Sequence, residues 1–256
     1  MHMDISHLAS LMLEGHQLYQ QGEFSKAQKA FINAKLTALG LLEKGGDQKD
    51  KLEDILHGSN RVLAITHIAK GNEKYNLGVV AYDPQTGIID PKKRSLLETA
   101  VESYHDAENA FLEFDASFRT PDERLAKIQW LGQLYNCWID AEYKLAVDFH
   151  NQGAKAISEA TSNGVKPEEL REGLKIWDKA MRSYGHIVEI ALTMAGRDNV
   201  QVHPSYVNSA VQSALELTDA SIQWANVLGD KALEQSYREK VSISWTIDPS
   251  NPALRN

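Results

Sequence analysis

Cysteine, long apolar runs and targeting signals are scarce or missing in this sequence, and each absence excludes a class of protein. The 256 residues include one cysteine, Cys137, which excludes an internal disulfide and a cysteine-cluster zinc site. No apolar run approaches the ~20 residues of a membrane span. The first residues lack the basic and apolar parts of a secretory signal. We therefore expect a cytoplasmic protein that does not bind membranes. Met1 and His2 are either native residues or an expression remnant.

Glycine and proline are also few, and the net charge is of one sign. The 16 glycines and 7 prolines cluster at a few points, which favours long helices over a β-protein with many turns. A formal net charge of −8 argues against nucleic-acid binding, because a nucleic-acid partner requires a basic surface. The same charge favours a basic segment on a protein or peptide partner.

Apolar residues at intervals of three and four, together with capping residues, divide the chain into about eight expected helices. Short connections make neighbouring helices antiparallel, so the eight helices form four hairpins. We expect one all-α domain over residues 1–256, built as a right-handed stack of hairpins or as a helical bundle. The expected hairpins cover residues 4–43, 47–118, 120–195 and 203–248.

Turn and cap residues predict several helix ends. The third helix begins near Asp47, and its one candidate break is at residues 58–60. Turn residues open a loop over residues 83–91, which is either a contact segment or a longer turn. The fourth helix then runs from about Pro91 to Phe118. The basic residues 92–94 in its first turn are interpreted as a solvated surface, with contact to an anion or an acidic partner as the alternative.

The fifth helix has the best-defined start in the sequence. Thr120 and Glu123 have the spacing of a capping box, with Pro121 in the first turn. No strong helix breaker follows until about Ala160. We expect Cys137 and the five tryptophans to pack in the core.

Residues 11–34 carry the most specific pattern of the chain. Gly15 and Ala27 are small enough for two helices to approach closely, and Phe31 fills the space around their contact. Gly22 between the helices suits the left-handed conformation that closes a helix. The segment is therefore expected to be a helical hairpin with closely packed axes.

The order of residues in this hairpin resembles a tetratricopeptide repeat, and the match covers residues 8–41. Fragments of the pattern occur elsewhere: Ala100, Tyr104 and Ala107 reproduce the alanine–aromatic–alanine order, and Leu77-Gly78 repeats a leucine–glycine pair. The resemblance implies an interaction module, a scaffold that binds a protein or peptide, with no cofactor and no catalytic residue.

The resemblance also implies candidate binding residues. The side chains of Gln17, Tyr19 and Gln20 lie on the first helix, away from its apolar face. Asn72 and Lys74 are the nearest equivalents of the lysines and asparagines with which such domains hold a terminal carboxylate.

Two other functions remain open from the sequence. Glu102 and His105 stand three residues apart on a helix, as in di-iron bundles, and would serve a metal-dependent enzyme or a metal carrier. Stacking of hairpins between chains would instead make a self-assembling structural protein, a homo-oligomer. The sequence contains neither a nucleophile elbow nor a phosphate-binding loop.

Overall fold

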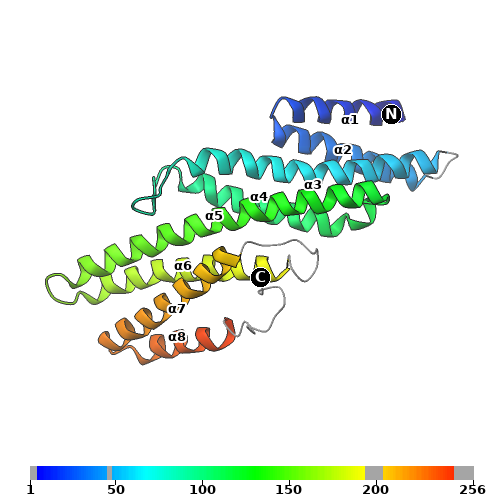
Figure 1. Ribbon diagram of the computed structural model, residues 1–256. Helices are drawn as coiled ribbons and strands as arrows, with labels where there is room; N and C mark the ends of the chain where they lie inside the picture. Colours follow the sequence, from blue (N-terminus) through cyan, green and yellow to red (C-terminus); the bar gives the residue numbers. More distant parts are fainter. Residues whose placement is uncertain (1–4, 45–47, 194–203, 245–256) are drawn as a thin grey trace. The chain divides into compact units, whose positions relative to one another are not determined.

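A computed structural model describes residues 5–44, 48–193 and 204–244 of the chain. These residues form an all-α fold of eight α-helices, with one short β-hairpin and one turn of 3₁₀ helix, η1 (Figure 1). The all-α class and the eight helices confirm the expectation from the sequence. The elements are α1 (Ile5–Gln20), α2 (Phe24–Leu42), α3 (Lys49–Val79), β1 (Tyr82–Asp83), β2 (Ile88–Ile89), α4 (Arg94–Glu113), η1 (Asp115–Ser117), α5 (Pro121–Thr161), α6 (Pro167–Thr193), α7 (Pro204–Val227) and α8 (Lys231–Ser244).

Contacts divide the chain into two compact units. Unit 1 comprises Met1–Tyr75 and Thr99–Leu134, and unit 2 comprises Asn76–Glu98 and Tyr135–Asn256. Each unit is described separately below. The single domain over residues 1–256 stays a prediction.

In unit 1, α1 and α2 form the antiparallel hairpin expected from residues 11–34 (Figure 1). Gly22 has a φ of 76°, its N–H donates to the Tyr19 carbonyl at 3.0 Å, and the Glu23 N–H donates to the Leu18 carbonyl at 2.9 Å. This pair of hydrogen bonds satisfies the last carbonyls of α1 and turns the chain back.

Close approach of the two helices depends on Gly15. A Cβ atom at Gly15 would lie 2.4 Å from the Phe31 ring, so only glycine leaves room for the ring. Phe31 and Ala27 are fully buried. The predicted contact is therefore confirmed.

The same arrangement of glycine against an aromatic ring recurs in two further hairpins. A Cβ atom at Gly71 of α3 would lie 2.6 Å from Tyr104 of α4, and one at Gly153 of α5 would lie 2.3 Å from Trp177 of α6. In all three hairpins the glycine lies on the first helix and the ring on the second. Gly78, which belongs to the leucine–glycine pair noted in the sequence, packs against Leu97.

Contacts within each unit show that these helix pairs are antiparallel. In unit 1, His57 of α3 meets Ser117 after α4, while Gly71 further along α3 meets Tyr104. In unit 2, α5 and α6 pair in the same way, and α7 packs against both α6 and α8. The α7–α8 turn closes at Gly229, whose φ is 67°. The eight helices thus form four antiparallel hairpins, as predicted.

One predicted boundary in the first half of the chain is wrong, and the candidate break in the third helix is absent. Helix α3 continues through residues 58–60, because Ser59 is buried and donates to the Ile55 carbonyl at 2.9 Å instead of capping a new helix. Helix α4 begins at Arg94, not at Pro91, because Asp90 holds a turn: its carbonyl accepts from Lys93 N–H at 2.8 Å and its carboxylate from Lys92 N–H at 3.0 Å. Helix α4 also ends at Glu113, and η1 follows it.

The expected turn at residues 83–87 is present in unit 2 as the tip of the β1–β2 hairpin. The carboxylate of Asp83 accepts from the Gln85 N–H at 2.9 Å and from the Thr86 hydroxyl at 2.8 Å. These bonds, first the one from Gln85, hold the pKa of Asp83 below its usual range. The loop is therefore an ordered hairpin.

A buried ion pair fixes this hairpin to α5 within unit 2. Asp148 has no exposed surface, and its carboxylate accepts from Arg94 Nε at 2.6 Å and from the Ile89 N–H at 2.9 Å. The interpretation of residues 92–94 as a solvated surface is therefore wrong for Arg94, although Lys92 and Lys93 are exposed.

Core positions follow the expected pattern with a few differences. Trp138 and Trp177 are buried, whereas Trp130, Trp224 and Cys137 are only half-buried. Trp245 and the predicted ends of the sixth and eighth helices, at 195–196 and 248, lie outside the described residues. None of the described helices combines the length and the apolar character that crossing a membrane requires.

Candidate functional site

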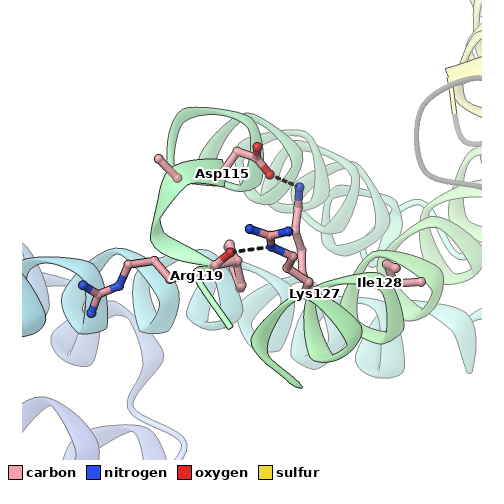
Figure 2. Close-up of a pocket in the computed structure, with 7 residues that line it drawn as sticks. Asp115, Arg119, Lys127 and Ile128 are labelled. Atoms are coloured by element: carbon pink, nitrogen blue, oxygen red, sulfur yellow. Dashed lines mark hydrogen bonds and ion pairs between the residues drawn. The ribbon is translucent and has the colours of Figure 1, made fainter. Parts of the chain in front are cut away.

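The described part of the chain has a pocket of about 580 Å³ in unit 1, where the chain passes from α4 to α5 (Figure 2). Asp115 of η1 lines one side, and Arg124, Lys127 and Ile128 of α5 line another. Phe118 and Arg119 complete the lining between the two elements. Ala116 also lines the pocket, which thus combines three cationic side chains, one carboxylate and three apolar side chains.

Helix α3 holds the η1 side of the pocket in place. Ser117 is buried, and its hydroxyl lies 3.0 Å from His57 Nδ1 and 3.2 Å from the amide nitrogen of Asn60. Its carbonyl accepts a hydrogen bond from Arg61 at 2.7 Å. Four polar groups on two elements therefore fix the turn that carries Asp115 and Phe118.

The predicted capping box holds the α5 side. The Glu123 carboxylate accepts from the Thr120 N–H at 3.0 Å, and the Glu123 N–H donates to the Thr120 hydroxyl at 3.2 Å. Arg61 adds an ion pair to Glu123 at 2.9 Å. The bond from Thr120 N–H is the main reason that the pKa of Glu123 lies below its usual range. The start of α5 is thus fixed, and Glu123 is ionised.

Two of the three cations in the pocket have carboxylate partners. Lys127 Nζ lies 2.5 Å from Asp115 Oδ1, and Figure 2 shows the two side chains pointing toward each other across the pocket. Arg119 contacts Asp54 of α3 at 2.6 Å, and this hydrogen bond raises the pKa of Arg119. Both carboxylates are largely exposed, so both pairs lie at the solvent boundary.

The third cation, Arg124, has no carboxylate partner among the described residues. Its Nε donates to the Phe118 carbonyl at 3.2 Å, which orients the guanidinium and leaves its other N–H groups for a further acceptor. Because a guanidinium is always charged and presents its donors in a planar fork, it suits a carboxylate or a phosphate.

This arrangement can bind an anionic group. The lining residues include no nucleophile beside a base. Phe118 and Ile128 add apolar surface beside the cations. The pocket therefore fits an acidic group on an otherwise apolar segment.

The candidate binding residues of α1 do not reach this pocket. Gln17 and Gln20 are exposed on α1, as predicted. Tyr19 is half-buried, and its ring packs edge-on against Phe24 at a centroid distance of 5.4 Å. Burial raises the pKa of the Tyr19 phenol. This tyrosine is therefore partly structural.

Asn72 and Lys74 lie close together on α3, and both are half-buried. No interaction among the described residues joins them to the three candidates on α1. The amide oxygen of Asn72 accepts from the Tyr104 hydroxyl at 2.8 Å, and Lys74 lies 3.4 Å from Glu73. Asn72 thus supplies a hydrogen-bond acceptor for the hydroxyl of Tyr104, whose ring packs on Gly71. Whether these five residues bind a partner stays a prediction.

The metal alternative places Glu102 and His105 on the exposed side of α4. His105 Nδ1 contacts the Asn109 amide at 3.2 Å. Across residues 5–44, 48–193 and 204–244, no three His, Cys, Asp or Glu side chains gather as metal ligands would. The pair alone supplies too few ligands for a structural metal site.

The three pocket cations are absent from the sequence-based candidates. Arg124 and Lys127 stand three residues apart on one helical face, which is a detectable signal. Asp115 precedes the three cations, and Asp122 and Glu123 stand directly before Arg124, so the sequence reads as a segment of mixed charge. Only the fold shows which of these charges are already paired. Compared with protein-family models and with curated proteins, the chain matches no family model and no curated sequence.

Proposed function

We propose that this chain is a non-catalytic helical scaffold, similar in design to tetratricopeptide repeats, that binds an acidic segment of a protein or peptide partner at the α4–α5 pocket. The observation that carries the proposal is Arg124, an oriented guanidinium without a carboxylate partner among the described residues, beside apolar Ile128. A cytoplasmic location is part of the proposal and is supported by the single cysteine.

The local charge of the pocket differs from that of the chain. The net charge of −8 favours a basic partner by long-range attraction, whereas the pocket presents three cations and one carboxylate. Short-range, oriented hydrogen bonds to a charged group are stronger than screened long-range attraction, so the proposal follows the pocket.

Fluorescence anisotropy with two labelled peptides tests the proposal, one of glutamate and leucine and one of lysine and leucine. We expect the acidic peptide to bind more tightly, and Arg124→Glu to weaken its binding about tenfold, since a hydrogen bond to a charged group contributes about 1.5–3 kcal/mol.

Arg182→Glu is the matched control. Arg182 is also an exposed arginine whose Nε donates to a backbone carbonyl, that of Asp178 at 3.4 Å, but it lies on α6. Tighter binding of the basic peptide, or an equal loss in both variants, would contradict the proposal.

A further inference from the structure

The outward side of α2 carries three large apolar side chains that the described residues leave largely exposed. Ile32, Leu36 and Leu39 are 44%, 60% and 36% exposed. Their spacing of four and three residues places them along one side of the helix. The other side of α2, with Phe31 and Ala34, is fully buried. Helix α2 is thus apolar on both sides, and one side has no partner in unit 1.

Four positions on this side of α2 are arranged symmetrically about Leu36. Ile32 lies four residues before Leu36 and Gly40 four after, while Lys29 lies seven before and Glu43 seven after. Steps of four and seven residues return to the same side of a helix. If α2 is reversed in direction about Leu36, Ile32 takes the place of Gly40, and Lys29 takes the place of Glu43. A large residue is then exchanged with a small one, and a cation with an anion.

Gly40 makes no close packing contact with the described residues. A Cβ atom there would meet none of their atoms within 4 Å, unlike one at Gly15. Glycine weakens a helix interior relative to alanine. The bare backbone at Gly40 leaves a shallow depression beside Leu36, of the kind that a branched side chain from another helix fills.

The two charged residues at the ends of this surface also lack partners. Lys29 and Glu43 are exposed, and neither side chain has an ion pair or hydrogen bond with another described residue. In contrast, Lys26 and Lys35 on the same helix are paired with Glu23 and Glu113. The charges that remain are the two that the symmetry would bring together.

We propose that two copies of this chain associate through α2, antiparallel, about a two-fold axis at Leu36. The Leu36 side chains of the two copies meet at the axis. Ile32 of each copy packs on Gly40 of the other, and Lys29 of each pairs with Glu43 of the other. A two-fold interface must be complementary to itself, which this surface is. The proposal does not depend on the α4–α5 pocket.

The association should be weak. A standard interface buries about 800 Å² per partner from about 20–30 residues a side, and this surface offers a few residues of a single helix. We therefore expect dimers at high protein concentration and monomers on dilution.

Sedimentation velocity over a range of concentrations tests the proposal. We expect the weight-average sedimentation coefficient to rise with concentration, and Leu36→Glu to abolish the rise because it places two carboxylates at the axis. Leu13→Glu on α1 is the matched control, since Leu13 is also 60% exposed. A monomer at every concentration, or an equal effect of both variants, would overturn the proposal.

A charge exchange tests the antiparallel register. Lys29→Glu and Glu43→Lys should each weaken association about tenfold, because each turns two attractive pairs into two repulsive ones. The double variant should restore it. Circular dichroism checks that each variant folds. Failure of the double variant to restore association would exclude this register, and with it the proposal.

Discussion

At the scale of single residues, the hairpins depend on glycines that face aromatic rings. Gly15→Ala should lower the free energy of unfolding by about 1–3 kcal/mol, because the new methyl group overlaps the Phe31 ring. Chemical denaturation followed by circular dichroism measures this loss.

Gly58→Ala is the control for this change. Its Cβ atom would have only the Met12 methyl group at 4.0 Å, so we expect a gain of up to about 1 kcal/mol from helix propensity. Equal effects at Gly15 and Gly58 would show that the ring does not occupy the space beside Gly15.

Burial decides how much an ion pair contributes. Arg94–Asp148 and Lys175–Glu172 both have a distance of 2.6 Å, but Asp148 is fully buried whereas Lys175 and Glu172 are 68% and 66% exposed. Asp148→Asn leaves a mostly buried arginine without its anion, at a cost of about 3–5 kcal/mol in unfolding free energy. Glu172→Gln should change it by less than about 0.5 kcal/mol. Thermal denaturation of the two variants compares them directly, and similar losses would contradict the prediction.

Contacts made by small residues could be predicted from the sequence, whereas partners of charged residues could not. Gly15, Ala27 and Phe31 stand at helical intervals, so their contact follows from local periodicity. Asp148 and Arg94 are 54 residues apart. No local pattern indicates which of 35 acidic residues is buried, and for the same reason the α4–α5 pocket could not be found from the sequence.

At the scale of helices, a histidine links α5 to α6 in unit 2. His186 Nδ1 lies 3.4 Å from Oε1 of the buried Glu142, and this hydrogen bond is the main reason that the pKa of His186 lies above 6.5. A raised pKa stabilises the fold fully below pH 6.5, and this stabilisation is lost as the pH rises through the pKa of the folded state. His186→Gln should therefore cost more unfolding free energy at acidic pH than at alkaline pH.

The pKa of His150 is shifted in the opposite direction from that of His186. Burial lowers its pKa, so the wild type loses stability as the pH falls below the unfolded value of 6.5. His150→Gln should reduce this acid sensitivity. Urea denaturation at several pH values measures both effects, and the same pH trend for both variants would contradict the assignment.

Helix boundaries were predicted best where capping is local. Thr120 and Glu123 hold the start of α5 as the sequence indicates, because both bonds lie within four residues. The start of α4 was predicted wrongly, because Pro91 suits both a first helical turn and the turn that Asp90 closes. At residues 58–60, packing of Ser59 against α1 overrides the local break signals: its hydroxyl lies 3.1 Å from the Met12 sulfur.

At the scale of the whole molecule, the placement of possible metal ligands bears on the metal-dependent alternative. The chain has 35 acidic residues and 9 histidines, yet no three possible ligands gather among the described residues. We expect treatment with a chelator to leave the unfolding temperature and the peptide affinity unchanged. Calorimetry before and after dialysis against EDTA measures the first, and a fall in unfolding temperature would favour the metal-dependent alternative.

The lone thiol of Cys137, which is half-buried within α5, can serve as a natural chemical probe of that helix. A maleimide or iodoacetamide reagent has one thiol to react with, so its rate measures how accessible the middle of α5 is to solvent. No engineered label is required for that measurement, and a bound peptide that steadies α5 would slow the alkylation.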